Sequence, residues 1–166
     1  MSYGSLSARA VESLNIGVQR AYAYHNTGEG GLSPYHSNGG DVVFHFGTGY
    51  FGVRGEDGNF SMEKMKELVA NNPFIRAIEI KLSQGAKPGK GGVLPGAKIT
   101  PEIAKIRGVK VGKDVLSPSA HTAFDDIPEL LQFIEDIANE TGLPVGIKAA
   151  IGKTDQWELL AKLMVA

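Results

Sequence analysis

The residues best suited to chemistry form a group of lysines around a glycine-rich loop. Lys81 lies near the end of an apolar run, and the chain from residue 82 to residue 98 then contains five glycines and two prolines. No acidic residue lies between Lys81 and Glu102, whereas three more cations follow in the loop: Lys87, Lys90 and Lys98. Ammonium groups beside a backbone that turns sharply form a binding site for anions. We therefore predict that this loop binds a negatively charged cofactor or substrate.

Two further positions repeat this arrangement. Lys148 lies inside the apolar run VGIKAAI, as Lys81 lies inside AIEIKL. A lysine buried in a strand is costly unless an opposite charge accompanies it. Glu29, in NTGEGG, places a charge of the opposite sign in a similar glycine-rich setting. The pattern alone also allows a solvated surface loop with a lysine at the edge of a strand, and the second lysine makes that alternative weaker.

Three other patterns lack the features that their usual sites require. GTGYFG (47–52) matches G-x-G-x-x-G, but a dinucleotide site needs a helix that starts there, and the next helix is expected only near Ser61. G-x-S-x-G is absent, which argues against a serine nucleophile. No two histidines have the i,i+4 spacing of a helical metal site, so we expect no metal and interpret all four as loop or core residues: His25, His36, His45 and His121.

The composition limits the class of protein. The chain has 166 residues, which is about one domain, with 17 basic and 18 acidic residues. A balanced charge does not attract nucleic acid or acidic membranes, so neither is expected as a partner. The chain contains no cysteine, which excludes disulfides and cysteine-ligated clusters within it. No apolar run is long enough to span a membrane and the first residues do not resemble a signal peptide, so we expect a cytoplasmic protein.

Alternating helices and strands are expected to position these residues. Apolar periodicity and capping residues predict helices over 7–20, from Ser61, from Thr100, over 126–142 and from Thr154. β-branched and aromatic runs predict strands at 21–26, 42–46, 74–82, 114–118 and 143–151. This alternation favours a parallel sheet covered by helices, whose ligands bind at the carboxyl ends of the strands.

The two ends of the chain fit this pattern less well. The chain opens on MSYGS, where a strand would be finishing, and it closes on a helix with no strand after it. A parallel strand such as VGIKAAI needs neighbours on both sides. We therefore expect a piece of a larger barrel that lacks strands at both ends, and we expect the isolated piece to be aggregated, oligomeric or molten and not to retain a bound cofactor.

Several segments together resemble the FMN-binding synthase domain of glutamate synthase, and most closely its short archaeal-type members. These segments are MSYGSLS, HNTGEGG, GTGYFGV, IKLSQGAKPGKGGVLPGAKITPEIAKIRG, VLSPSAH and VGIK, in this order. The resemblance implies an α/β protein that forms part of a TIM (β/α)₈ barrel, roughly its first five β/α units. Residues 1–166 would then be a partial domain that lacks the later strands.

The resemblance also implies an activity and a set of site residues. Ammonia, free or derived from glutamine, and 2-oxoglutarate would form 2-iminoglutarate, which FMN-dependent reduction would convert to L-glutamate. Lys87 and Arg107 match positions that hold the carboxylates of 2-oxoglutarate, and Glu29 and Lys87 match catalytic positions. The residues that match positions around the flavin are Ser2, Gly4, Lys81, Gln84 and Lys148. An electron-donor subunit or ferredoxin would supply the electrons.

The sequence departs from the family in several places. Val93 stands where the large glutamate synthases have glutamine, which puts one substrate contact in doubt. The GGTG segment and the cysteine triplet of the family's 3Fe–4S cluster do not occur in the chain. Two alternatives therefore stay open: a non-catalytic half-barrel that binds an anionic metabolite or completes a barrel with a partner chain, and an FMN barrel enzyme acting on another 2-oxo or 2-hydroxy acid.

Overall fold

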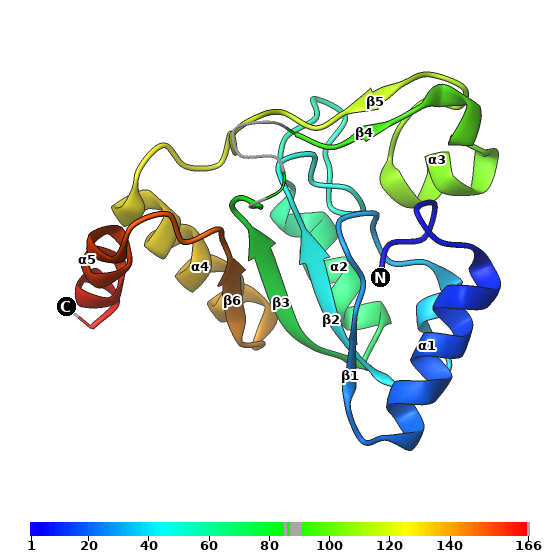
Figure 1. The fold of residues 1–166 in the computed structure, drawn as a ribbon, viewed down its shortest axis with the longest axis horizontal. Helices are drawn as coiled ribbons and strands as arrows, with labels where there is room; N and C mark the ends of the chain where they lie inside the picture. The colour runs from blue at the N-terminus through cyan, green and yellow to red at the C-terminus, as the bar shows by residue number, and fades with distance from the viewer. Residues whose placement is uncertain (85, 87–90, 166) are drawn as a thin grey trace.

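Helices and strands alternate along most of the chain in the computed structural model, which describes residues 1–84, 86 and 91–165 (Figure 1). The helices are α1 (Ala8–Arg20), α2 (Met62–Asn71), α3 (Pro101–Arg107), α4 (Ile127–Thr141) and α5 (Thr154–Met164), with short 3₁₀ turns at Pro34–His36 and Gly96–Lys98. The strands are β1 (Tyr24–Asn26), β2 (Asp41–Phe46), β3 (Ile75–Lys81), β4 (Val93–Leu94), β5 (Val115–Leu116) and β6 (Val145–Lys148).

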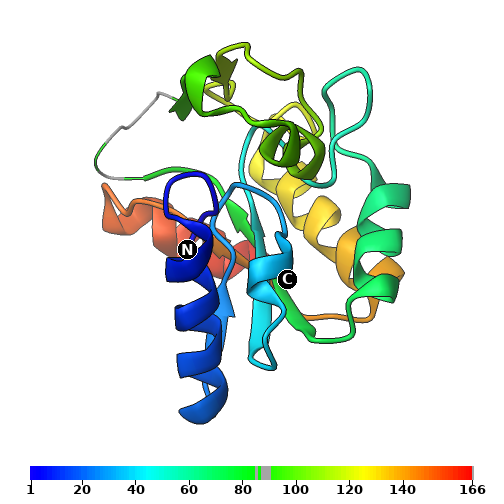
Figure 2. The ribbon, with the colours of Figure 1, turned by 90° about the vertical axis from the view of Figure 1, so that its right-hand side faces the viewer.

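Four strands form one parallel sheet in the order β1-β2-β3-β6. This confirms the predicted α/β class with a parallel, helix-covered sheet. Figures 1 and 2 show α2 and α4 along one face of the sheet, α1 beside β1, and α5 next to α4. The arrangement is compatible with part of a barrel, and both the barrel itself and the partial domain at 1–166 stay predictions.

The predicted strand at 114–118 does not join this sheet, so the expectation of five β/α units is wrong for the described residues. Only Val115 and Leu116 adopt strand geometry, and they pair antiparallel with β4 in a separate two-stranded unit. The apolar sequence favours a strand, but strand propensity depends strongly on tertiary context and does not specify the partner strand. This two-stranded unit and α3 lie over the carboxyl ends of β2 and β3, and α4 is the helix that directly precedes β6 (Figure 1).

Most helix starts are fixed by side-chain caps, of which the sequence predicts those at Ser61, Thr100 and Asp126. The side chains of Ser7, Ser61, Thr100 and Asp126 each accept a hydrogen bond from the backbone N–H three residues later. Gly142 ends α4 in the left-handed conformation that favours glycine.

The sequence predicts Thr154 as the N-cap of the last helix, and this assignment is wrong by one residue. Helix α5 already includes Thr154, its N-cap is Lys153, and no side chain caps it. The spacing of Asp126 and Glu129 is also that of a capping box, in which the Glu129 side chain would accept a hydrogen bond from the backbone N–H of Asp126. The observed bond differs. Glu129 Oε2 accepts from the backbone N–H of Asp125 at 2.7 Å, one residue before the N-cap.

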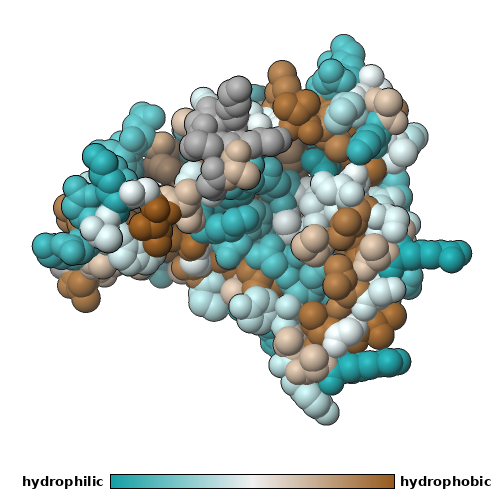
Figure 3. All heavy atoms as spheres, in the orientation of Figure 1, coloured by the Kyte–Doolittle hydropathy of each residue, from teal (hydrophilic) through white to brown (hydrophobic). Residues whose placement is uncertain are grey.

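The two faces of the sheet differ in character because side chains alternate along each strand. Phe44, Phe46, Ile78 and Ile80 point to one face, where they pack with residues of α2 and α4, including Met65, Leu68, Phe133 and Ile137. The opposite face carries polar side chains from four strands: Asn26, His45, Glu79, Lys81 and Lys148. In Figure 3, hydrophilic residues gather over the sheet in the centre of the view, on the side away from α2 and α4.

None of the helices in the described part of the chain combines the length and hydropathy that a membrane-spanning segment requires.

Candidate functional site

The loop after β1 holds Glu29 in a fixed position. The Asn26 side chain accepts a hydrogen bond from the backbone N–H of Gly28 at 2.9 Å, and Thr27 Oγ1 accepts one from the N–H of His45 on β2, also at 2.9 Å. Gly28 has φ of 64°, a conformation that costs glycine little. A Cβ at Gly28 would lie 2.9 Å from the backbone nitrogen of Ser2, so the N-terminal segment packs directly on this loop.

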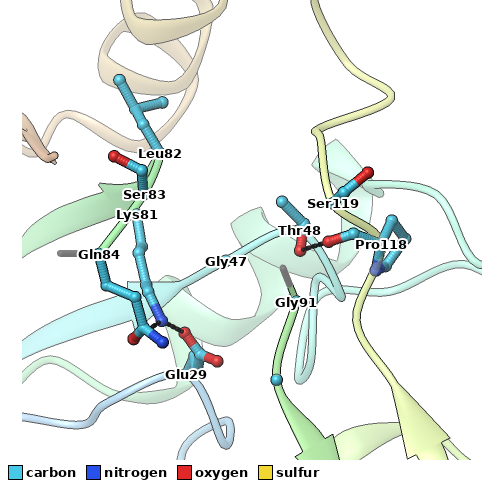
Figure 4. Close-up of a pocket in the computed structure, with 11 residues that line it drawn as sticks. Glu29, Gly47, Thr48, Lys81, Leu82, Ser83, Gln84, Gly91, Pro118 and Ser119 are labelled. Atoms are coloured by element: carbon cyan, nitrogen blue, oxygen red, sulfur yellow. Dashed lines mark hydrogen bonds and ion pairs between the residues drawn. The ribbon is translucent and has the colours of Figure 1, made fainter. Parts of the chain in front are cut away.

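Glu29 forms an ion pair with Lys81 at the carboxyl end of β3. Lys81 Nζ donates to Glu29 Oε2 and also, at 2.8 Å, to Gln84 Oε1 (Figure 4). The side chains of Lys81 and Glu29 are 14% and 27% exposed, so the pair is shielded but open to a cavity. The ammonium group therefore has one charged and one neutral partner, and a ligand that enters beside it meets both signs of charge.

Lys148 lies next to Lys81 on the same face of the sheet. The two residues are register partners on β6 and β3, and the neighbouring pair Ile80 and Ile147 packs toward the helices. Lys148 is close enough to His45 that its charge helps to lower the pKa of this histidine, although burial is the larger cause. The two lysines thus add positive charge to the face away from the helices.

Arg107 ends the short helix α3 and is 5% exposed. One of its terminal nitrogens donates to the backbone oxygen of Tyr3 at 3.2 Å and to Ser2 Oγ at 3.4 Å, and its guanidinium lies 5.2 Å from the centre of the Phe51 ring. Its Nε has no partner among the described residues. Burial lowers the pKa of Arg107, and the charge of Glu29 opposes this shift, so the residue is a buried cation with donor capacity to spare.

Two adjoining cavities lie between these groups. The larger, about 230 Å³, is lined by residues that include Ser2, Glu29, Phe51, Gln84, Arg107 and Ser117. The smaller, about 60 Å³, is lined by Glu29, Lys81, Gln84, Thr48, Pro118 and Ser119, among others, most of which Figure 4 shows. Glu29, Gln84 and Gly92 border both cavities. An anionic ligand in the larger cavity would contact Arg107 at one end and approach the Glu29–Lys81 pair at the other.

The structure brings most of the predicted site residues together. Glu29, Lys81 and Gln84 are in direct contact, Ser2 and Arg107 share a hydrogen bond, and Lys148 is the strand neighbour of Lys81. A Cβ at Gly4 would lie 3.3 Å from Arg107, so Gly4 borders the same guanidinium. Lys87 and Lys90 lie outside the described residues. The roles assigned to all these residues stay predictions.

Sequence reasoning missed the polar residues beneath the ion pair. Asn26, His45 and Glu79 point to the same face as Lys81, and both Asn26 Nδ2 and His45 Nδ1 contact Glu79 Oε1. The alternation in DVVFHF (41–46) and IEIK (78–81) carries this signal, because it places residues 45, 79 and 81 on one side of their strands. His45 was expected to be a core or loop histidine, and it is indeed buried.

His121 serves the local structure. Its ring nitrogens lie 3.0 Å from the Tyr50 hydroxyl and 2.9 Å from the backbone oxygen of Lys81. The same hydroxyl accepts hydrogen bonds from the backbone N–H groups of Thr122 and Ala123. Tyr50 and His121 therefore attach the segment after β5 to the end of β3.

A parallel α/β sheet with cations gathered at the carboxyl ends of its strands defines a class of proteins that bind anionic ligands there. Comparison with known proteins specifies the family. Residues 1–162 match the family model described as the conserved region in glutamate synthase. The chain belongs to the glutamate synthase family.

Three curated relatives illustrate the range of the family. The chain is 46% identical over 158 residues to the glutamate synthase large subunit-like protein YerD of Bacillus subtilis, covering 94% of this chain and 30% of that protein. It is 39% identical over 153 residues to the archaeal-type glutamate synthase [NADPH] of Thermotoga sp., covering 90% and 27%. It is 34% identical over 154 residues to the ferredoxin-dependent glutamate synthase of Cyanidium caldarium, covering 82% and 10%. The chain thus spans less than a third of the length of these relatives.

Proposed function

We propose that this chain contributes the substrate and flavin contacts of an FMN-dependent glutamate synthase. The reaction joins ammonia to the keto carbon of 2-oxoglutarate with loss of water, and reduces the resulting 2-iminoglutarate to L-glutamate. Membership of the glutamate synthase family supports an oxidoreductase role and does not favour the alternative of a non-catalytic half-barrel. The cytoplasmic location expected from the sequence stays a prediction.

The observation that carries the proposal is the buried guanidinium of Arg107 at the wall of the larger cavity. It is nearly inaccessible, its Nε has no partner in the described structure, and the Glu29–Lys81 pair lies across the same cavity. A carboxylate accepts strong, charge-assisted hydrogen bonds from a guanidinium. One carboxylate of 2-oxoglutarate bound there would direct the rest of the molecule toward Glu29. Lys87, which lies outside the described residues, is proposed to contact a carboxylate as well.

The residues on the polar face fit a flavin. Lys81 and Lys148 are adjacent across two strands and point away from the helices, and Lys81 borders a polar cavity, where Gln84 adds an amide beside it. A cation near the pyrimidine part of a flavin stabilises the negative charge of its reduced form. Ser2 and Gly4 are proposed to lie along the same cofactor. FMN, when bound, supplies the electrons for the reduction, while the protein residues hold and orient the substrate.

The Glu29 carboxylate is proposed to act where ammonia reaches the substrate. Lys81 holds this carboxylate in place, so that a hydrogen-bond acceptor lies at the border of both cavities. An acceptor there binds an N–H group of ammonia so that the nitrogen lone pair faces the keto carbon, and it can take a proton from the nitrogen as the carbon–nitrogen bond forms. The ammonium of Lys81, which contacts Glu29, is proposed to donate a proton to the oxygen that leaves as water.

Two further proposals concern the source of the electrons and the source of the ammonia. The relatives' names specify NADPH in one case and ferredoxin in another, so a donor subunit or ferredoxin is proposed here. Without cysteine, the chain has no thiolate to ligate the 3Fe–4S cluster that the complete family proteins are expected to carry. Ammonia is proposed to arrive either free or from glutamine hydrolysis.

The proposal is tested in the protein as its gene encodes it. The protein is supplied anaerobically with FMN, ammonium, 2-oxoglutarate and reduced methyl viologen, and glutamate is measured by chromatography. We expect glutamate formation, and we expect Arg107→Lys to lower kcat/KM for 2-oxoglutarate by about tenfold to a hundredfold, because lysine lacks the second donor of the guanidinium. Arg9→Lys on α1 is the matched control. The absence of glutamate with the wild-type protein, or an unchanged kcat/KM in Arg107→Lys, would contradict the proposal.

A further inference from the structure

A polar network lies on the sheet directly beneath the Glu29–Lys81 pair. Glu79 Oε1 accepts a hydrogen bond from Asn26 Nδ2 at 2.8 Å and lies 2.5 Å from His45 Nδ1. The three residues come from adjacent strands β1, β2 and β3. The side chain of His45 is 3% exposed and that of Glu79 is 28% exposed, so the network lies within the protein but not in a sealed core.

Both partners of Glu79 also hold the loop that carries Glu29. The side-chain oxygen of Asn26 accepts from the backbone N–H of Gly28, the residue before Glu29. The backbone N–H of His45 donates to Thr27 Oγ1. The nitrogen and the oxygen of the Asn26 amide therefore have different tasks: the first binds Glu79, and the second fixes the turn into Glu29.

Glu79 is connected just as closely to the other member of the ion pair. It lies two residues before Lys81 on β3, and both side chains point to the face away from the helices. A strand is a stiff element, so the position of Glu79 relative to Lys81 is set by the backbone. Glu79 thus spans the two parts of the site: the strand that carries Lys81 and, through Asn26, the loop that carries Glu29.

We propose that Glu79 is a positioning residue that sets the placement of Glu29 against Lys81 through its hydrogen bond to Asn26. If this position mattered only for folding, an apolar side chain would stabilise the protein more, because a carboxylate withdrawn from water is costly unless its hydrogen bonds are satisfied. The placement of Glu29 against Lys81 follows from the hydrogen bonds of this structure alone. The effect of Glu79 on turnover rests, in addition, on the proposed function.

Two measurements test the placement without using activity. The first is hydrogen exchange of the peptide amides around Gly28, and the second is the rate at which an amine-reactive ester labels Lys81, relative to the exposed Lys153. We expect Glu79→Ala to speed amide exchange in this loop by about tenfold, the effect of losing one hydrogen bond, and to speed Lys81 labelling several-fold. Glu79→Gln keeps a side-chain oxygen that accepts from Asn26, so both rates should stay within about twofold of wild type.

Matched controls separate positioning from general loosening. Glu135→Ala and Asn139→Ala change exposed residues of α4 and should leave both rates unchanged. If Glu79→Ala does not fold, Asn26→Ala removes the same hydrogen bond by deleting its donor. The rate of Lys81 labelling in Asn26→Ala then tests the proposal. Unchanged labelling in the folded variant, or equal acceleration in Glu79→Gln and Glu79→Ala, overturns the proposal.

Turnover gives an independent measurement. Arg107 is held by Ser2 and Tyr3 and not by this network, so KM for 2-oxoglutarate should stay within about twofold in Glu79→Ala while kcat falls by about tenfold or more. Glu79→Gln should restore most of kcat. If wild-type protein makes no glutamate, the proposed function fails, whereas exchange and labelling still decide on Glu79. A rise in KM with kcat unchanged would contradict the proposed role.

Discussion

The two faces of β2 and β3 use the same backbone for different purposes. On the helix-facing side, Phe44, Phe46, Ile78 and Ile80 are essentially inaccessible and form the main apolar core. On the opposite side, one residue along, His45, Glu79 and Lys81 form ion pairs and hydrogen bonds beside a cavity. Stability therefore depends mainly on one set of alternate residues, and the proposed chemistry depends on the other. Substitutions on the two faces should separate these properties.

The largest effect is expected from the helix-facing side. Phe46→Ala removes a fully buried ring that packs against Phe60 and Phe133, and it should lower the free energy of unfolding by about 3–5 kcal/mol. The measurement is denaturant unfolding followed by circular dichroism, with Lys148→Ala as the exposed control on the same sheet. A loss below about 1 kcal/mol would mean that the apolar face is not the main source of stability.

Substitutions on the polar face should lower activity much more than stability. Lys81→Met keeps the length of the side chain but removes the cation next to Glu29, so kcat for glutamate formation should fall by about 10²–10³-fold. Because the pair is partly exposed, the unfolding free energy should change by only about 1 kcal/mol. Steady-state kinetics and denaturation on the same preparation make the comparison. A variant that loses stability and activity in parallel would contradict the separation of the two faces.

Lower pH should destabilise the fold through its buried histidines. Burial is the main cause that lowers the pKa of His25, to about 4, and of His36, His45 and His121 below the ordinary value near 6.5. The unfolded chain then takes up protons before the folded chain does, so stability is full above about pH 6.5 and decreases as the pH falls toward 4.

Thermal unfolding measured from pH 8 to pH 5.5 tests this expectation. The melting temperature should be nearly constant above pH 7 and fall by several degrees at pH 5.5. His25→Gln removes one of the buried titrating groups and should make the fall smaller. A melting temperature that rises on acidification would mean that the histidines gain, and do not lose, stabilising partners when they are charged.

The smallest effect concerns the helix ends outside both faces. Ser61→Ala removes the side-chain cap of α2 and should cost about 1 kcal/mol, whereas Thr154→Ala should change stability by less than about 0.5 kcal/mol because Thr154 caps nothing. Chemical denaturation of the two variants measures the difference. Equal losses would mean that Thr154 does cap α5.

The sequence allowed much of the fold to be predicted because its local signals agree with one another. Capping residues at Ser7, Ser61, Thr100 and Asp126 mark helix starts, and these depend on hydrogen bonds within one turn. The strand at 114–118 was assigned to the wrong partner because pairing of so short a strand is decided by tertiary structure.

The candidate site was predictable only in part. Lysines in apolar strands indicate Lys81 and Lys148 directly, the glycine-rich run NTGEGG indicates Glu29, and the family resemblance adds Gln84 and Arg107. The burial of Arg107 depends on the N-terminal segment lying over α3, a contact between residues more than 100 positions apart. The role of Glu79 depends on Asn26, which is 53 residues away. Contacts of this kind leave no local trace in a sequence.

The border between the two cavities leaves little space around the Glu29 carboxylate. A Cβ at Gly92 would lie 3.0 Å from one Glu29 oxygen, and a Cβ at Gly47 would lie 3.3 Å from the other. An alanine at either position would press on the carboxylate from its own side. The two glycines, which come from different segments of the chain, therefore leave Glu29 the space in which it meets Lys81.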